Sequence, residues 1–236
     1  MIIIENLVVS YDKGHNVIDL LNLILSQNSI NGIVGLNGAG KTTLLNSIYG
    51  LKSIDTGIIK YNDVKINKKK ISFLETENYF YSNITAREYL SLFKNRQFDI
   101  EKWNKLFSLP LDTIIDDYST GMKKKLALIG TLKQDKPIMI LDEPFNGLDI
   151  ETCRIIRQIL LKLKEQNKII IITSHIIETL TNLCDYIHYL ENGKIKYSNN
   201  KSEFKEFERI IFATIENQNE DLINELMRIP QILPKI

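Results

Sequence analysis

The chain has 236 residues, of which 44% are hydrophobic and 25% are charged, and its formal net charge is +1. This composition suits a globular protein with one large domain, or a core with an inserted subdomain. The near-zero net charge argues against a broad nucleic-acid-binding surface, and no apolar run approaches the ~20 residues that span a bilayer. The amino terminus lacks the basic start and cleavage site of a signal peptide, so we expect a cytoplasmic protein.

Short apolar runs predict β-strands through the first third of the chain. Ile2 to Val9 combines apolar residues with two polar ones and is predicted as an edge strand, and Val17 to Leu25 is predicted as another strand. The run from Ile30 to Val34 is typical of a buried strand. Ile58 to Tyr61 and Ile71 to Leu74 are predicted as two further short strands.

A glycine-rich stretch follows the strand at 30–34 and leads into a helical pattern. It fits G-x-x-x-x-G-K-[ST], the phosphate-binding P-loop, in which glycines let consecutive backbone N–H groups face one anion. Lys41 is expected to reach the β- and γ-phosphates of a nucleotide, and the Thr42 hydroxyl is expected to ligate Mg2+. The residues expected to bind the nucleotide here are Gly35, Asn37, Gly38, Ala39, Gly40, Lys41, Thr42 and Thr43.

From about residue 80 to 135 the apolar spacing becomes helical. Thr85 and Glu88 form a capping-box pattern, which predicts a helix start. Trp103 lies in a second short helical pattern, and a third begins near Met122. We therefore predict a helical subdomain that is inserted into an otherwise α/β chain.

Strands and helices alternate again after Pro137. Ile138 to Leu141 and Lys168 to Thr173 are predicted as strands buried on both faces, with a helix between them. A strand from Tyr186 to Leu190 is joined to the next by a strong hairpin signal at 192–193. The pattern predicts an α/β fold: a P-loop NTPase core with a mostly parallel sheet, antiparallel β additions and the inserted α-helical subdomain.

The last part of the chain, residues 201–236, is predicted as a short extension whose role the sequence does not assign. Ile210 to Ile215 is predicted as a strand and Asp221 to Arg228 as a short helix.

Two acidic residues and a histidine follow buried strands, where open α/β sheets bind their ligands. Asp142 is expected to hold Mg2+. Glu143 is expected to orient or deprotonate a water that attacks the γ-phosphate. His175 is expected to hydrogen-bond the same phosphate or to position Glu143. The alternative for His175 is a structural role, which is the more common one for a lone histidine at a strand end.

With these motifs in order, residues 1 to about 200 resemble the nucleotide-binding ATPase subunit of an ABC transporter. The P-loop matches the family's Walker A motif, and Ile138 to Asp142 matches Walker B. Glu143 matches the catalytic base and His175 matches the switch histidine. Tyr11 matches the aromatic residue that stacks on the base, although ordinary packing is the alternative for a single aromatic.

Two further stretches extend the resemblance. Asn146 to Asp149 resembles the D-loop, and Tyr118 to Met122 resembles the signature motif. Ser119 would supply a hydroxyl to an anion, and Gly121 would let backbone N–H groups approach it at a helix start. The three lysines that follow, residues 123–125, are expected to form the solvated face of that helix, with attraction to the phosphates as the alternative.

The resemblance implies a head-to-tail homodimer that holds two ATP molecules with Mg2+ at its interface, so that Ser119 and Gly121 of one chain contact the nucleotide of the other. It also implies a separate polytopic membrane permease as partner, a place on the inner face of the cell membrane through that permease, and no nucleic acid. The form of the signature and the compact helical subdomain favour export of a peptide, antibiotic or lipid cargo.

The sequence departs from the family pattern at two places. The signature has Thr120 where glycine is usual and Met122 where glutamine is common, a form also found in subunits that serve two-component exporters. The glutamine of the family's Q-loop should fall near residue 76, where the sequence reads Glu75-Thr76-Glu77. The Thr76 hydroxyl could still bind Mg2+ or a water, and a glutamate beside it could substitute. Two alternatives therefore stay open: a non-transport ABC-type ATPase, and a regulatory ATP-binding subunit with low turnover.

Overall fold

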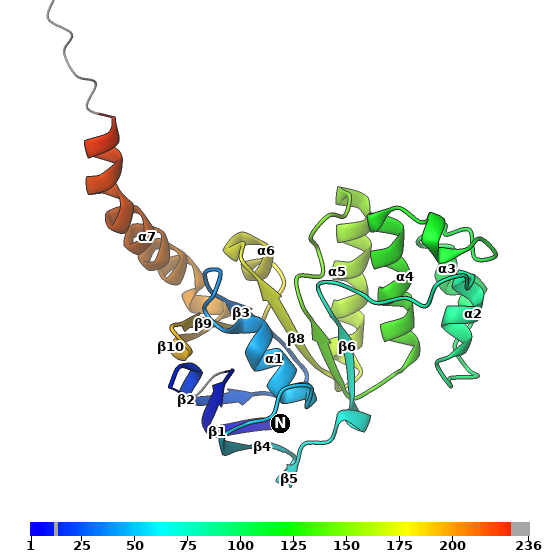
Figure 1. The fold of residues 1–236 in the computed structure, drawn as a ribbon, viewed down its shortest axis with the longest axis horizontal. Coiled ribbons are helices and arrows are strands. Elements are labelled where there is room, and N and C mark those ends of the chain that lie inside the picture. Colours follow the sequence, from blue (N-terminus) through cyan, green and yellow to red (C-terminus); the bar gives the residue numbers. More distant parts are fainter. Residues whose placement is uncertain (12–13, 228–236) are drawn as a thin grey trace, which may run out of the picture.

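A six-stranded sheet forms the central layer of the fold, in a computed structural model that describes residues 1–11 and 14–227 (Figure 1). Its strands are β3 (Ser29–Val34), β6 (Ile71–Leu74), β7 (Ile138–Leu141), β8 (Ile169–Ser174), β9 (Tyr186–Glu191) and β10 (Lys194–Asn200). They lie in the order β10-β9-β3-β8-β7-β6, and only the pair of β9 and β10 is antiparallel. The predicted mostly parallel sheet with an antiparallel addition is confirmed.

A second, antiparallel sheet contains β1 (Ile2–Ser10), β2 (Asn16–Leu25), β4 (Thr56–Tyr61) and β5 (Val64–Lys65). Its order is β2-β1-β4-β5, so the prediction that the first strand is an edge strand is wrong. The polar residues of β1 have another cause. Ile2 and Ile4 are buried, whereas Glu5 is exposed and pairs with Lys60. An interior strand of an antiparallel sheet carries polar side chains when one of its faces meets solvent.

The helix that follows the P-loop, α1 (Lys41–Tyr49), packs in the core that joins the two sheets. Leu44, Leu45 and Ile48 of α1 are buried with Ile138 and Ile140 of β7. The alternate residues of β7 join the core on the opposite face of the sheet. Both faces of the central strands are therefore covered, which explains their unbroken apolar runs.

The remaining helices up to residue 203 build the other face of the central sheet and the inserted segment. They are α2 (Ala86–Ser91), α3 (Ile100–Asn104), α4 (Thr120–Lys133), α5 (Ile150–Glu165) and α6 (Ile177–Thr181), with short 3-10 turns η1 (Lys68–Lys70), η2 (Ile115–Asp117) and η3 (Lys201–Glu203). The expected capping box of Thr85 and Glu88 starts α2. In Figure 1, α2, α3 and α4 lie at the opposite end of the molecule from β1 and β2.

The carboxyl-terminal segment is one helix, α7 (Phe204–Leu226), so the strand predicted over 210–215 is wrong. Phe204, Phe207 and Ile211 recur at helical spacing and are buried. The ring of Phe207 packs edge-on against Tyr189 of β9, with 6.2 Å between the ring centroids. The short helix predicted over 221–228 falls within the end of α7 as far as Leu226, and Arg228 lies outside the described residues. Within residues 1–11 and 14–227, no helix has the length and apolar character to cross a membrane.

Candidate functional site

The carboxyl ends of β3, β6 and β7 open onto one cavity. The P-loop follows β3, Thr76 lies two residues after β6, and Asp142 follows β7 directly. The residues that line the cavity are Val17, Asn37, Gly38, Gly40, Lys41, Thr42, Thr43, Thr76, Asp142 and Glu143. The structure thus brings together the P-loop, both acids and Thr76, which lie up to a hundred residues apart in the chain.

The P-loop has a backbone conformation that suits an anion. Gly38 and Gly40 have φ values of 81° and 104°, a region that side chains other than glycine rarely adopt. A Cβ atom on Gly40 would also lie 3.0 Å from the backbone oxygen of Val17. No side chain caps the start of α1. Its first N–H groups and the positive end of its dipole therefore face the cavity as donors for a phosphate.

Lys41 is the cation of this cavity. Lys41 is 9% exposed, and its ammonium donates to the backbone oxygens of Gly35 and Leu36, at 2.6 and 3.2 Å. Burial lowers the pKa of Lys41, and the nearby carboxylates of Glu143 and Asp142 oppose that shift. Phosphate oxygens form stronger, charge-assisted bonds than neutral carbonyls do, so a nucleotide would compete effectively for this ammonium.

Asp142 is held by hydroxyl groups on both of its carboxylate oxygens. Thr42 Oγ1 donates to Oδ2 at 3.0 Å and Thr173 Oγ1 donates to Oδ1 at 2.5 Å, and Asp142 is only 2% exposed. The Thr76 hydroxyl lies 3.5 Å from the backbone oxygen of Asp142. Hydroxyl and carboxylate oxygens are the ligands that Mg2+ prefers, so this group of residues fits the ion.

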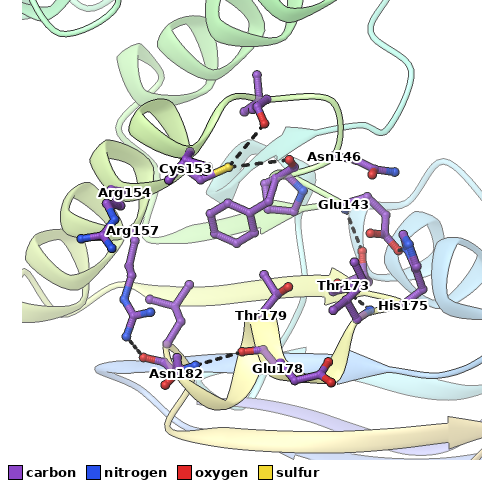
Figure 2. Close-up of a pocket in the computed structure, with 17 residues that line it drawn as sticks. Glu143, Asn146, Cys153, Arg154, Arg157, Thr173, His175, Glu178, Thr179 and Asn182 are labelled. Carbon is purple, nitrogen blue, oxygen red and sulfur yellow. Dashed lines mark hydrogen bonds and ion pairs between the residues drawn. The ribbon is translucent and has the colours of Figure 1, made fainter.

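Glu143 is positioned from two sides. Its backbone has a φ of 50°, which is uncommon for a residue with a side chain. Its N–H donates to Thr173 Oγ1 at 3.0 Å, and its Oε1 lies 3.0 Å from Nδ1 of His175 (Figure 2). The Glu143 side chain is 14% exposed and that of His175 is 44% exposed. Glu143, which is expected to act on the attacking water, is therefore in direct contact with His175.

Behind this pair lies a second cavity, of about 380 Å³, which Figure 2 shows between α5, α6 and the end of β8. Phe145 and Cys153 line its interior, and Arg157 lies at the α6 side, where it donates to the backbone oxygen of Asn182. Glu143 and His175 line it as well, so it shares a wall with this pair.

Four other predicted site residues do not line the cavity between the P-loop and the acids. Ala39 packs into the core, and Gly35 offers its carbonyl to Lys41. Ser119 is exposed and caps α4 by accepting from the N–H of Met122 at 3.3 Å, and Gly121 follows in the first turn of α4. The signature therefore lies outside the P-loop cavity of its own chain.

Tyr11 reaches the P-loop without lining the cavity. It is 59% exposed, and its hydroxyl lies 3.4 Å from Thr43 Oγ1. The ammonium of Lys52 sits 4.1 Å from the centre of the Tyr11 ring, an arrangement in which a cation is attracted to the ring. One face of the ring is thus already in contact with a cation.

Sequence reasoning missed two residues that support the acids. Thr173 continues an isoleucine-rich strand, and nothing in that run distinguishes its hydroxyl from a β-branched filler. Lys124 belongs to the predicted solvated face of α4, and this prediction is wrong because Lys124 is 8% exposed. The loop after β7 packs against α4 and offers backbone carbonyls to the ammonium, so the lysine is buried.

The sequence of the chain is similar to those of known proteins. Residues 18–146 match the sequence model of the family described as ABC transporter. The chain is 34% identical, over 81% of its length and 74% of the relative's, to the uncharacterized ABC transporter ATP-binding protein MJ1023 of Methanocaldococcus jannaschii. It is 35% identical to the bacitracin transport ATP-binding protein BcrA of Bacillus licheniformis, over 75% of this chain and 63% of BcrA.

Solved structures share the fold. The dimeric ATP-binding cassette MJ0796 in a post-hydrolysis state, bound to ADP and Pi, superposes with a TM-score of 0.76 at 23% identity. The match covers 85% of this chain and 99% of that one.

The double role of Thr173 predicts a specific loss of stability. Replacing Thr173 by valine leaves the Glu143 N–H and one oxygen of the buried Asp142 without a partner. We expect the free energy of unfolding to fall by about 1–3 kcal/mol for each buried group left unpaired, as measured by urea denaturation. Thr173→Ser keeps the hydroxyl and should lose only about 1 kcal/mol for the missing methyl group. A valine variant as stable as the serine variant would contradict the assignment.

Proposed function

Because the chain belongs to the ABC transporter family, whose members are ATPases, we propose that it is the ATP-hydrolysing subunit of an exporter. In this proposal, two copies dimerise on ATP and drive a separate membrane permease. One observation carries the proposal. Lys41, Thr42, Asp142 and Glu143 line a single cavity, while Ser119 of the same chain lies outside it. One chain thus offers the chemistry of hydrolysis and, on its α4 surface, an anion-binding helix start.

The P-loop binds the phosphates of ATP. Backbone N–H groups from Asn37 to Thr43 surround the β-phosphate, and Lys41 moves from the loop carbonyls to the β- and γ-phosphates. Thr42 and Asp142 would hold Mg2+, and Thr76 would bind the ion or one of its waters. Bound there, the ion would neutralise charge that develops on the β- and γ-phosphate oxygens. Tyr11 stacks on the base through the face of its ring that Lys52 does not cover.

Glu143 carries out the proton transfer of hydrolysis. A water positioned by its carboxylate attacks the γ-phosphorus, the bond to the bridging oxygen of ADP breaks, and the water proton passes to Glu143. His175 holds Oε1 of Glu143 through its Nδ1, which leaves the second carboxylate oxygen to take the proton. Lys41 stays on the phosphate oxygens while negative charge shifts toward ADP.

The second copy completes the site. Ser119 and Gly121 at the start of α4 donate to the γ-phosphate held by the P-loop of the partner subunit, so that ATP joins the two chains and its hydrolysis separates them. The Asn146–Asp149 loop, next to Glu143, runs across the same interface. The binding of the two chains to each other thus depends on the γ-phosphate. The joined and the separated chains are the two states to which the permease would respond.

The permease supplies the path for the cargo. In this proposal the permease is a separate chain, to which this one binds at the cytoplasmic face of the cell membrane. The signature with Thr120 and Met122, together with the similarity to a protein named for bacitracin transport, supports export of a peptide, antibiotic or lipid. The net charge of +1 argues against nucleic acid as partner.

A regulatory subunit with low turnover is the second candidate, and Thr76 is the observation that favours it. A threonine hydroxyl reaches less far than the usual glutamine, and it sits 3.5 Å from the Asp142 carbonyl, so its hold on the ion or its water would be weaker. A non-transport ATPase is the third, and its partners would be soluble.

Replacing Glu143 by glutamine tests the catalytic base. The amide keeps the size of the side chain and cannot take the proton, so kcat should fall on the order of 10²- to 10⁴-fold, measured as phosphate release. Binding of a fluorescent ATP analogue should change less than about threefold, because the substitution removes proton transfer and not ground-state binding. Glu165→Gln, at an exposed ion pair with Lys162, is the matched control. Full activity in the Glu143 variant would refute the role of the base.

The permease is tested by what the protein binds in its own cells. We expect affinity purification of the tagged chain from mild-detergent extracts, followed by mass spectrometry, to recover a polytopic membrane protein in stoichiometric amount. Extracts from cells that express the tag alone are the control. Recovery of only soluble partners, ribosomes or DNA would contradict the transport assignment and favour the non-transport ATPase, while leaving the ATP chemistry intact.

A further inference from the structure

A buried lysine connects the signature helix to the loop that carries Glu143. Lys124 lies in the second turn of α4, five residues after Ser119, and is 8% exposed. Its ammonium donates to the backbone oxygen of Glu143 at 2.6 Å and to that of Asn146 at 3.0 Å. These two bonds close the loop that begins at Glu143 and fasten it to α4.

Lys124 bonds to Glu143, a residue whose backbone conformation is restricted. Glu143 has a positive φ and precedes Pro144, which restricts the backbone of the residue before it. Thr173 accepts from its N–H at 3.0 Å, and Lys124 donates to its carbonyl. The two peptide groups that flank the Glu143 Cα are therefore fixed from opposite sides, and together they set the direction of the side chain toward His175.

The neighbouring lysines do not share this role. Lys123 is more exposed, and its ammonium makes a 3.4 Å contact to the backbone oxygen of Asp116. Lys125 pairs with the carboxylate of Asp149 at 3.2 Å, at the far end of the same loop. Of these three lysines, Lys124 is the one whose ammonium donates a hydrogen bond to the Glu143 backbone. Burial lowers its pKa, while the carboxylates of Glu143 and Asp142 act in the opposite direction.

We propose that Lys124 is a positioning residue that orients Glu143 for hydrolysis and ties that orientation to the position of the signature helix. The proposal rests on the role of Glu143 in the proposed function. A shift of α4 that accompanies binding of the partner's nucleotide at Ser119 would reach the Glu143 carbonyl through this one buried side chain on the same helix.

A double-mutant cycle on ATP hydrolysis tests this role. Lys124→Met keeps the length of the side chain and removes its donors, so kcat should fall about 10- to 100-fold from misplacement of the carboxylate. The KM for ATP should change less than about threefold, since no ATP-binding group is lost. Adding Lys124→Met to Glu143→Gln should change the residual rate less than about twofold, because a positioning residue has no effect once the group it positions is gone.

A matched control separates positioning from general destabilisation. Lys168 is 7% exposed and donates to the backbone oxygen of Lys136 at 2.9 Å and to the carboxylate of Asp135 at 2.6 Å, at the end of β8 that is far from the cavity. Lys168→Met should leave kcat within about twofold of wild type. If Lys124→Met does not fold, as judged by thermal denaturation, Lys124→Gln takes its place in the cycle, since its amide keeps a donor on a shorter side chain and should retain part of kcat.

The outcomes distinguish the two claims. A normal kcat in the Lys124 variant beside an inactive Glu143→Gln variant would overturn the role of Lys124 alone. So would an equal loss in Lys168→Met, or a full further loss when the two substitutions are combined. Wild-type activity in Glu143→Gln by itself would overturn the catalytic base, and with it the positioning role that depends on it.

Discussion

The hydroxyl of Thr173 is the contact on which the geometry of the site depends. It donates to the carboxylate of Asp142 and accepts from the N–H of Glu143. It can do both because β7 and β8 are parallel neighbours, with Leu141 opposite Ile172, so the end of one strand lies beside the start of the loop after the other. An acid that is 2% exposed needs such donors, because a buried carboxylate without partners is strongly disfavoured.

The same constraint explains how two adjacent acids can take different roles. The backbone of Asp142 continues the direction of β7, and its carboxylate accepts a hydrogen bond from Thr42 of the P-loop. The positive φ of Glu143 instead turns its side chain toward His175. Without the partners on both sides of its peptide groups, an uncommon backbone conformation of this kind would not persist. The proposed division between ion binding and proton transfer thus follows from backbone geometry.

A single chain supplies only part of the chemistry that the proposal requires. Its P-loop cavity is lined by a cation, hydroxyls and two acids, and the exposed helix start at Ser119 lies elsewhere on the surface. A second copy can bring that helix start to the nucleotide, which makes ATP part of the interface. Lys124 then gives the interface a direct connection to the catalytic acid.

Much of the fold could be predicted from the sequence, since β7 and β8 are unbroken apolar runs that only a sheet covered on both faces explains. The places of Lys41 and Asp142 in the site could be predicted as well, because each of them lies in a recognisable sequence motif. Thr173 and Lys124 could not, because their partners are backbone groups that tertiary packing brings to them. The error at 210–215 has a similar origin: β-branched residues there favour a strand, and the packing of Phe207 on β9 selects a helix.

The central claim is that ATP joins two copies of this chain through the helix start at Ser119. The most direct measurement is the molar mass of the Glu143→Gln variant by light scattering after size exclusion, with MgATP, with ADP and without nucleotide. The account predicts the mass of two chains with MgATP only, and the mass of one chain when Ser119→Arg is added to the variant. The mass of a single chain under all three conditions, or a dimer that ignores both ATP and the Ser119 substitution, would contradict it.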